Sequence, residues 1–257
     1  MGYQNIRFRI EDRVARVALA RLPLNVFNIA MMREIAHCLR ECRDQRELAA
    51  IVFEAAPEAR AFSAGVAVED HEEKVVYQML EGFHAIFRLL EQMGKPTLAL
   101  VNGAALGGGC ELVAACDIVV AGENAKFGQP EIKLGVFPPV ACVLLPRVIG
   151  EKRARELILT GELINAHEAW RIGLVNYVVP PAQIEAKAQE ILGKLRELSA
   201  PVLQAARQAM ELGRGSTFMQ ALDRTQNFYL DELLRLDDAQ EGVKAFMEKR
   251  KPIWRNK

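Results

Sequence analysis

Residues 101–131 read VNGAALGGGCELVAACDIVVAGENAKFGQPE, and the rest of the chain is organised around this stretch. Three consecutive glycines, Gly107 to Gly109, precede Glu111, and Glu131 follows twenty residues later. The apolar run before the glycines is strand-like, and the segment after them suits a helix. Such a junction exposes backbone N–H groups at the positive end of a helix. We therefore predict a site for an anion or a developing oxyanion.

The glycines alone are also compatible with a tight turn and close helix-to-strand packing. Their spacing gives no GxGxxG, and no Lys-Ser/Thr pair follows, so neither the dinucleotide fingerprint nor the phosphate loop fits. Glu111 favours catalysis, because it lies three residues after Gly108 in the first turn of an otherwise apolar helix. The alternative is a helix-start charge that interacts with the dipole, worth about 0.3–1 kcal/mol.

Glu131 supplies a second carboxyl group. A strand over residues 118–121 is followed by a loop at residues 127–131, and a return to the same edge of the sheet places Glu131 opposite Glu111. Paired carboxyl groups in a poorly hydrated pocket titrate together, so one holds a proton while the other acts as a base. Addition of water across a double bond requires this division of labour.

Strand-like and helix-like segments alternate over the first 180 residues, and the pattern after Pro181 is helical. We expect a hairpin over residues 6–21, strands over 49–53, 97–101, 118–121 and 175–179, and helices over 30–45, 73–93, 110–116, 151–160 and 166–170. Pro138 and Pro139 are expected to break the chain before residues 140–149, and a further break is expected near Pro201. The pattern predicts an α/β layered fold with mostly parallel pairing, and a soft boundary near Ala200.

Composition bounds the function classes. Basic and acidic side chains balance at 33 each, which argues against a general nucleic-acid binder. The five cysteines include no CxxC pair, so we expect no disulfide framework and no metal site. The N-terminus has no signal-like apolar segment, and no apolar run is long enough to span a membrane. These features predict a cytoplasmic protein with a small ligand and no nucleic-acid or membrane partner.

Four motifs carry a resemblance to a known family. The central signature, residues 101–135, occurs with AFSAGV at 61–66, PRVIGEKRARELILTGELINAHEAWRIGLVNYVV at 146–179 and EGVKAFMEKRKPIW at 241–254. Together they resemble the enoyl-CoA hydratase/isomerase family, the crotonase superfamily. The resemblance implies a crotonase-like spiral of ββα units over residues 1–200, and a C-terminal helical oligomerisation region over 201–257. It also implies a homotrimer or homohexamer, and an acyl-CoA substrate of which coenzyme A is a part, with no separate cofactor.

The resemblance further implies roles for individual residues. The N–H groups of Val66 and Gly108 would form the oxyanion hole, and each such donor contributes on the order of 3 kcal/mol to transition-state stabilisation. Glu111 would activate water and Glu131 would deliver a proton to carbon, although the reverse assignment stays open. The residues implied in binding substrate or coenzyme A are Asn25, Val26, Ala64, Gly65, Val66, Phe137, Lys249 and Lys251. From the residues alone, the last two read as a solvated basic end.

A narrower resemblance is carried by residues 63–80, 126–150 and 228–250, which are similar to the cyclohexa-1,5-dienecarbonyl-CoA hydratases of anaerobic aromatic degradation. Residues 137–142, FPPVAC, replace a glycine-rich run of common hydratases, and Ala67 replaces an aspartate. A bulkier, less polar acyl pocket suits a cyclic dienoyl group. We therefore expect a hydro-lyase acting on cyclohexa-1,5-diene-1-carbonyl-CoA. The alternatives are a linear-chain enoyl-CoA hydratase or isomerase, and a non-catalytic RNA- or partner-binding protein of this fold.

Overall fold

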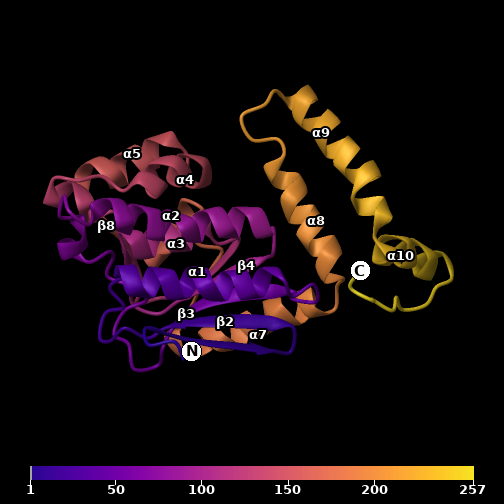
Figure 1. Cartoon of the computed structure of the whole chain (residues 1–257), viewed down its shortest axis with the longest axis horizontal. Helices are drawn as coiled ribbons and strands as arrows, with labels where there is room; N and C mark the ends of the chain where they lie inside the picture. The colour runs from indigo at the N-terminus through magenta and orange to yellow at the C-terminus, as the bar shows by residue number, and fades with distance from the viewer. Residues whose placement is uncertain (1) are drawn as a thin grey trace.

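A six-stranded sheet lies at the centre of the computed structural model, which describes residues 2–257 (Figure 1). The strand order is β1-β2-β3-β4-β6-β9; β1 and β2 are antiparallel, and every other neighbouring pair is parallel. The bounds are β1 Ile6–Glu11, β2 Val14–Leu19, β3 Ala50–Ala55, β4 Thr97–Val101, β6 Ile118–Gly122 and β9 Tyr177–Val179. The predicted hairpin and mostly parallel pairing are confirmed.

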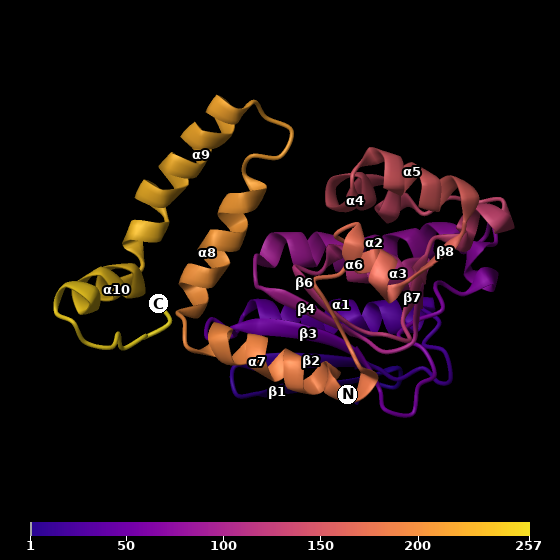
Figure 2. The same cartoon turned by 180° about the vertical axis from the view of Figure 1, so that it is seen from behind.

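Helices cover both faces of this sheet (Figure 2). Alternate strand residues such as Ile51 and Phe53 join the larger core beneath α1 and α2, whereas Val52 faces α7 and packs near Ile191. This two-sided burial explains why the central parallel strands β3, β4 and β6 are mostly apolar. The helices of the body are α1 Ile29–Arg43, α2 Val76–Met93, α3 Gly108–Ala115, α4 Pro139–Ile149, α5 Glu151–Thr160, α6 Ala166–Arg171 and α7 Ile184–Arg196.

A second, three-stranded sheet positions the glycine junction. Strand β5 (Ala104–Leu106) pairs in parallel with β7 (Lys126–Gly128), which pairs antiparallel with β8 (Leu163–Asn165). The glycines therefore follow β5, and the expectation that they directly follow the strand at residues 97–101 is wrong. Three-residue strands are too short to show a period, so only their pairing partners define them.

Helix α4 begins at the Pro138-Pro139 pair. The expected break before residues 140–149 is present, because Pro138 is the N-cap of α4 and Pro139 is its first residue. Proline is tolerated at that position because the N–H it lacks has no partner inside the helix. Pro201 likewise lies in the first turn of a helix, α8 (Ala200–Glu211), and the interruption falls before it.

Short 3-10 helices complete the body and the tail. Their bounds are η1 Val68–His71, η2 Pro130–Leu134, η3 Pro181–Gln183 and η4 Leu233–Arg235. Among them, η2 carries Glu131 in its first turn and so contributes to the site described below.

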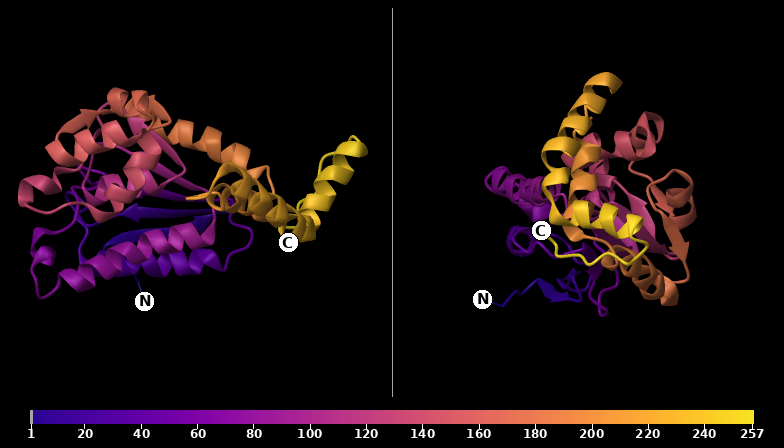
Figure 3. Two further views of the ribbon diagram at one scale, coloured as in Figure 1. Left: turned by 90° about the horizontal axis from the view of Figure 1, so that it is seen from above. Right: turned by 90° about the vertical axis from the view of Figure 1, so that its right-hand side faces the viewer.

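The C-terminal helices begin at the expected boundary. After α8 come α9 (Phe218–Asp231) and α10 (Asp237–Met247), and both stand away from the sheet (Figure 3). The division into a core over residues 1–200 and an oligomerisation region over 201–257 stays a prediction. Within residues 2–257, none of the helices combines the length and apolar character needed to cross a membrane.

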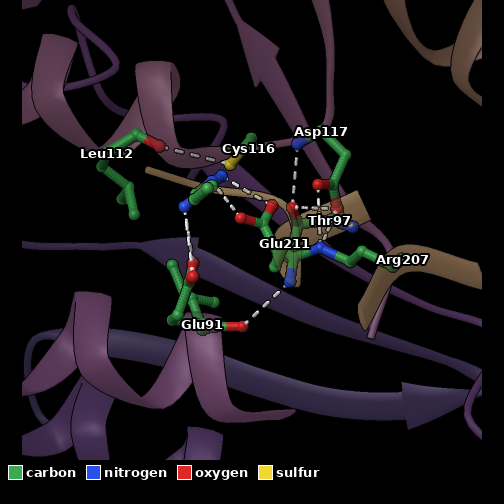
Figure 4. A network of polar contacts seen from close by, with 9 residues as sticks. Glu91, Thr97, Leu112, Cys116, Asp117, Arg207 and Glu211 are labelled. Atoms are coloured by element: carbon green, nitrogen blue, oxygen red, sulfur yellow. Dashed lines mark hydrogen bonds and ion pairs between the residues drawn. The ribbon is translucent and has the colours of Figure 1, made fainter. Parts of the chain in front are cut away.

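Helix α8 is tied to the body by a partly buried ion pair (Figure 4). The Nε of Arg207 lies 2.8 Å and 2.9 Å from the two carboxylate oxygens of Asp117, which directly follows the C-cap of α3. Asp117 also accepts hydrogen bonds from the backbone N–H (2.7 Å) and the hydroxyl (2.8 Å) of Thr97. The start of the tail is thereby fixed next to the helix that carries Glu111.

Candidate active site

The loop at residues 61–66 runs beside the glycine junction. The N–H of Leu106 donates to the carbonyl of Ser63 (2.9 Å), and the N–H of Phe27 donates to the carbonyl of Gly65 (2.8 Å). A Cβ built on Gly108 would lie 2.9 Å from Cγ2 of Val66, so these two residues are immediate neighbours. Within residues 2–257 neither of their N–H groups has an acceptor. Two free donors thus lie side by side, as an oxyanion hole requires.

Gly107 has a backbone conformation that only glycine adopts readily. Its φ is +50° and its ψ is −125°. A Cβ at this position would also collide with Oε1 of Glu131. The absent side chain therefore makes room for the Glu131 carboxyl group directly beneath the start of α3.

Glu111 is almost completely buried, with 3 % of its surface exposed. The N–H of Ala141, in the first turn of α4, donates to its Oε1 (2.7 Å). Burial, which strips water from the charged form, and the nearby Glu131 carboxylate together raise the pKa of Glu111 to about 8. The Ala141 N–H opposes this rise in pKa but does not outweigh burial.

Glu131 approaches the same point from the other side. Its Oε1 lies against Gly107, and its Oε2 is buried without a hydrogen-bond partner in the described chain. Burial raises the pKa of Glu131 to about 7. The structure therefore brings Glu111 and Glu131 together, as predicted. Both ionise near neutral pH, so the pair can hold one proton there.

Asn25 is fully buried rather than exposed to a ligand. Its side-chain Nδ2 donates to the carbonyls of Ala61 and Phe62, at 3.1 Å each, and its backbone carbonyl accepts from the Ser63 hydroxyl (2.7 Å). Asn25 thus supports the loop that ends in Val66. Coenzyme A can therefore contact this loop through its backbone and through the neighbours of Asn25. The binding role of Asn25 itself stays a prediction.

The remaining predicted binding residues fall into two groups. Val26, Ala64 and Gly65 lie in or beside the loop that ends in Val66, and Phe137 is 64 % exposed in the segment between η2 and α4. By contrast, Lys249 and Lys251 are exposed beyond α10, on the side of the molecule away from α3 (Figure 1). One chain does not bring these lysines to its own glutamates. The contact with coenzyme A that was predicted for them stays a prediction.

Several residues at the site were not singled out from the sequence for a role in it. They include Ala141, whose backbone N–H contacts Glu111, and Phe83, whose ring lies against Gly108. Gln129 is also fully buried beside Cys110. In the sequence, Phe83 is one of the apolar residues of the helix expected over residues 73–93, and Gln129 adjoins the Pro-Glu pair in FGQPE. The sequence does not identify a backbone donor such as the Ala141 N–H, because every residue type except proline carries one.

Comparison with known proteins assigns the fold to a family. The family model described as enoyl-CoA hydratase/isomerase matches residues 9–257. The chain belongs to the enoyl-CoA hydratase/isomerase family. The crystal structure of an enoyl-CoA hydratase from Bacillus anthracis is similar to it with a TM-score of 0.92 and 32 % identity, covering 99 % of this chain and 100 % of that one. The predicted crotonase-like fold is confirmed.

Curated relatives within the enoyl-CoA hydratase/isomerase family cover nearly the whole chain. A cyclohexa-1,5-dienecarbonyl-CoA hydratase from Thauera aromatica is 37 % identical over 96 % of this chain and 95 % of its own length. A short-chain-enoyl-CoA hydratase from Clostridium acetobutylicum is 35 % identical over 98 % of this chain and 97 % of its own length. These relatives are named as hydratases, and the prediction of an enzyme of the hydro-lyase class is confirmed at that level.

Proposed function

We propose that this protein adds water reversibly to a conjugated cyclic enoyl-CoA thioester, cyclohexa-1,5-diene-1-carbonyl-CoA. The observation that carries the proposal is the pairing of Glu111 and Glu131 beside two free backbone donors. Both carboxyl groups have pKa values raised into the neutral range by burial. An acid and a base are therefore available together, next to a place for a thioester oxygen.

The chemistry follows from this arrangement. The thioester carbonyl accepts hydrogen bonds from the N–H groups of Val66 and Gly108, which polarises the conjugated double bond. Glu111 takes a proton from water, and the water oxygen forms a bond to the ring carbon as the π electrons move onto the thioester oxygen. Glu131 then gives its proton to the carbon next to the carbonyl, which restores the thioester. One water is added, and the two carboxyl groups exchange protonation states, which bulk water resets.

Apolar groups around the carboxyl pair suit a ring. The ring centroids of Phe83 and Phe87, both on α2, lie 4.9 Å apart, and the Phe83 ring lies against Gly108. Pro138 is buried and Pro139 begins α4, so rigid apolar residues stand where α4 meets Glu111. The 37 % identity to the dienecarbonyl-CoA hydratase supports the same substrate class.

A linear-chain enoyl-CoA hydratase is the second candidate. The 35 % identity to the short-chain-enoyl-CoA hydratase favours it, because the two identities are nearly equal. The same pair of carboxyl groups would serve either substrate, so only the acyl group distinguishes the two candidates.

Assembly and location complete the proposal. Lys249 or Lys251 of one chain contacts a phosphate of the coenzyme A bound by another, because neither lies near its own site. This contact implies more than one chain, and the family resemblance favours a homotrimer or a homohexamer. We place the enzyme in the cytoplasm with an acyl-CoA as its small-molecule partner, without a nucleic-acid or membrane partner.

The experiment is a substrate panel. Purified protein is mixed separately with cyclohexa-1,5-diene-1-carbonyl-CoA and crotonyl-CoA, and products are separated by chromatography and weighed by mass spectrometry. We expect the mass to increase by one water, faster with the cyclic thioester. Faster reaction of crotonyl-CoA would transfer the proposal to the linear-chain hydratase, and no gain of water by either thioester would refute hydration.

Matched variants test the site itself. Glu111→Gln and Glu131→Gln should each lose most turnover while still binding a coenzyme A ligand. Glu123→Gln is the control, because Glu123 is exposed in the loop after β6. Near-native turnover by either site variant would remove that residue from the mechanism, and near-native turnover by both would favour the non-catalytic binding protein.

A further inference from the structure

Ser63 is completely buried between the two backbone segments that supply the free donors. Its N–H donates to the carbonyl of Ala104 (3.0 Å), and its carbonyl accepts from the N–H of Leu106 (2.9 Å), so its backbone pairs with β5. A Cβ built on Gly109 would lie 2.7 Å from the Cβ of Ser63, so the start of α3 packs directly on this residue. Ser63 therefore touches the glycine junction from inside the loop that ends in Val66.

The hydroxyl of Ser63 joins two further backbone groups. It donates to the carbonyl of Asn25 (2.7 Å) and accepts from the N–H of Gly65 (3.2 Å). Asn25 has a φ of +50° and Gly65 a φ of +105°, both in the region that few residues adopt. The hydroxyl thus bridges two turns of uncommon backbone conformation, and it occupies the N–H that precedes the free donor of Val66.

The pairing of Phe27 leaves the Val66 N–H unused. The carbonyl of Gly65 accepts from the Phe27 N–H (2.8 Å), and the N–H of Ala67 donates to the Phe27 carbonyl (2.8 Å). In such a parallel pair, the residue between the two bonded neighbours directs its own N–H and C=O away from the partner segment. Val66 therefore keeps its N–H out of this pairing, and Gly108 lies in contact with the same turn.

We propose that Ser63 is a positioning residue for the oxyanion hole. Its hydroxyl fixes the turn at Gly65, and thereby the Val66 N–H, beside the Gly108 N–H before substrate binds. This inference rests on the proposed function. Donors that are already in place stabilise a developing oxyanion without reorganising during the reaction. A misplacement of about 1 Å can lower a rate by about a hundredfold, so a small shift of one donor should be measurable.

Other side chains hold the loop without fixing this turn. The Nδ2 of Asn25 donates to the carbonyls of Ala61 and Phe62, which precede Ser63 in the chain. Among the described residues, the hydroxyl of Ser63 is the side-chain group that hydrogen-bonds to the backbone of residues 64–66. A role in packing alone would be met by any small side chain, whereas a positioning role requires the hydroxyl.

The test compares Ser63→Ala, which removes the hydroxyl, with Ser199→Ala as a matched control. Ser199 is also buried, at the N-cap of α8. Its hydroxyl likewise donates one hydrogen bond, to Asp238 (2.6 Å), and accepts one, from the Val202 N–H (3.4 Å). Both variants therefore lose a buried bridge, but only Ser63→Ala loses it beside the oxyanion hole. Thermal unfolding reports whether the losses in stability are comparable.

The readout is the infrared carbonyl stretch of a bound thioester, because hydrogen bonds to the carbonyl oxygen lower its frequency. The probes are cyclohexanecarbonyl-CoA and butyryl-CoA, each labelled with carbon-13 at the carbonyl; both are saturated, so neither can be hydrated. We expect the wild type and Ser199→Ala to lower the frequency equally. Ser63→Ala should lose about half of that shift, since one of two donors is misplaced, and about tenfold in kcat with little change in KM.

A second variant guards against misfolding. Ser63→Cys keeps a weaker donor and acceptor at the same place, so its carbonyl stretch should lie between those of the wild type and Ser63→Ala. The full wild-type shift in a folded Ser63→Ala protein, or in Ser63→Cys if the alanine variant does not fold, would overturn the positioning role. Because the probes do not react, a protein that hydrates neither unsaturated thioester but shows these shifts would refute the proposed function and leave this inference standing.

Discussion

At the scale of single residues, burial makes Glu111 both reactive and costly to ionise. Its carboxyl group accepts a hydrogen bond from the Ala141 N–H, and only 3 % of the residue is exposed. The folded protein therefore holds the proton at pH values where the unfolded chain has already released it. The property that supports acid-base chemistry thus lowers the stability of the fold as pH rises.

The free energy of unfolding should depend on pH because the pKa of Glu111 is raised in the folded protein. The pKa of Glu111 rises from an ordinary 4.5 to about 8 on folding, so the folded state binds more protons and stability falls with pH between these values. Glu111→Gln cannot ionise, and we expect it to be more stable than the wild type at pH 8.5 by at least about 2 kcal/mol, with the difference vanishing near pH 4.5. Thermal unfolding across this pH range measures the effect. A constant difference at all pH values would contradict the burial of an ionisable carboxyl group.

Gly107 offers a second prediction at this scale. Gly107→Ala forces a strained backbone and pushes Oε1 of Glu131 aside, so we expect a loss of about 1–3 kcal/mol in stability together with a marked loss of turnover. Gly135→Ala is the control, because Gly135 also has a positive φ but no atom within 4 Å of the added Cβ. Chemical denaturation and steady-state kinetics test both. Equal turnover in the two variants would argue against a tight fit between Gly107 and Glu131.

At the scale of elements, the sequence predicted the helices and strands that show a hydrophobic period. It did not predict the short strands that are defined by their pairing with distant segments. Helix α5 was predicted with its observed bounds, because its caps and apolar stripe are local signals. The strands of the small sheet, which place Gly107, were not predicted. The contact between the Ala141 N–H in α4 and Glu111 was not predicted either. The identities of the two glutamates were thus readable from the sequence, whereas the contacts that set their pKa values were not.

The docking of α8 supplies a prediction about elements. Arg207→Met leaves the Asp117 carboxylate without its cation, although Thr97 still donates to it. We expect a loss of about 1–2 kcal/mol, because removing Arg207, the buried partner of a partly buried ion pair, leaves the Asp117 charge without its cation. Arg88→Met, which breaks an exposed pair with Glu81, should cost about 0–1 kcal/mol. Urea denaturation measures the free energy of unfolding of both variants. Similar losses in the two would show that the Arg207–Asp117 pair contributes little to stability.

At the scale of the whole molecule, the tail presents apolar side chains to solvent. Phe246 is 86 % exposed and Phe218 is 77 % exposed, on helices that stand away from the sheet (Figure 3). Large exposed apolar patches mark interaction surfaces. Together with the remote position of Lys249 and Lys251, this surface explains why the proposed function requires more than one chain.

The proposed assembly makes a measurable prediction. Sedimentation should give three or six times the 28.6 kDa of one chain. Phe246→Asp should shift the distribution toward single chains and lower turnover at low protein concentration, because charge on an apolar contact is costly when buried. Ile10→Asp, on the edge strand β1, is the matched control. A wild-type protein that sediments as a single chain would contradict the proposed assembly and the role of the two lysines.

Incorporation of oxygen from labelled water into the product is the most direct test of addition of water by the carboxyl pair. The wild type, Glu111→Gln and Glu131→Gln are each incubated with cyclohexa-1,5-diene-1-carbonyl-CoA in water enriched in oxygen-18, and the hydroxyacyl product is weighed. We expect the wild type to incorporate one labelled oxygen per thioester, and each variant to form product at least about a hundredfold more slowly. Absence of label in the wild-type product, or wild-type rates of labelling in both variants, would contradict hydration by Glu111 and Glu131.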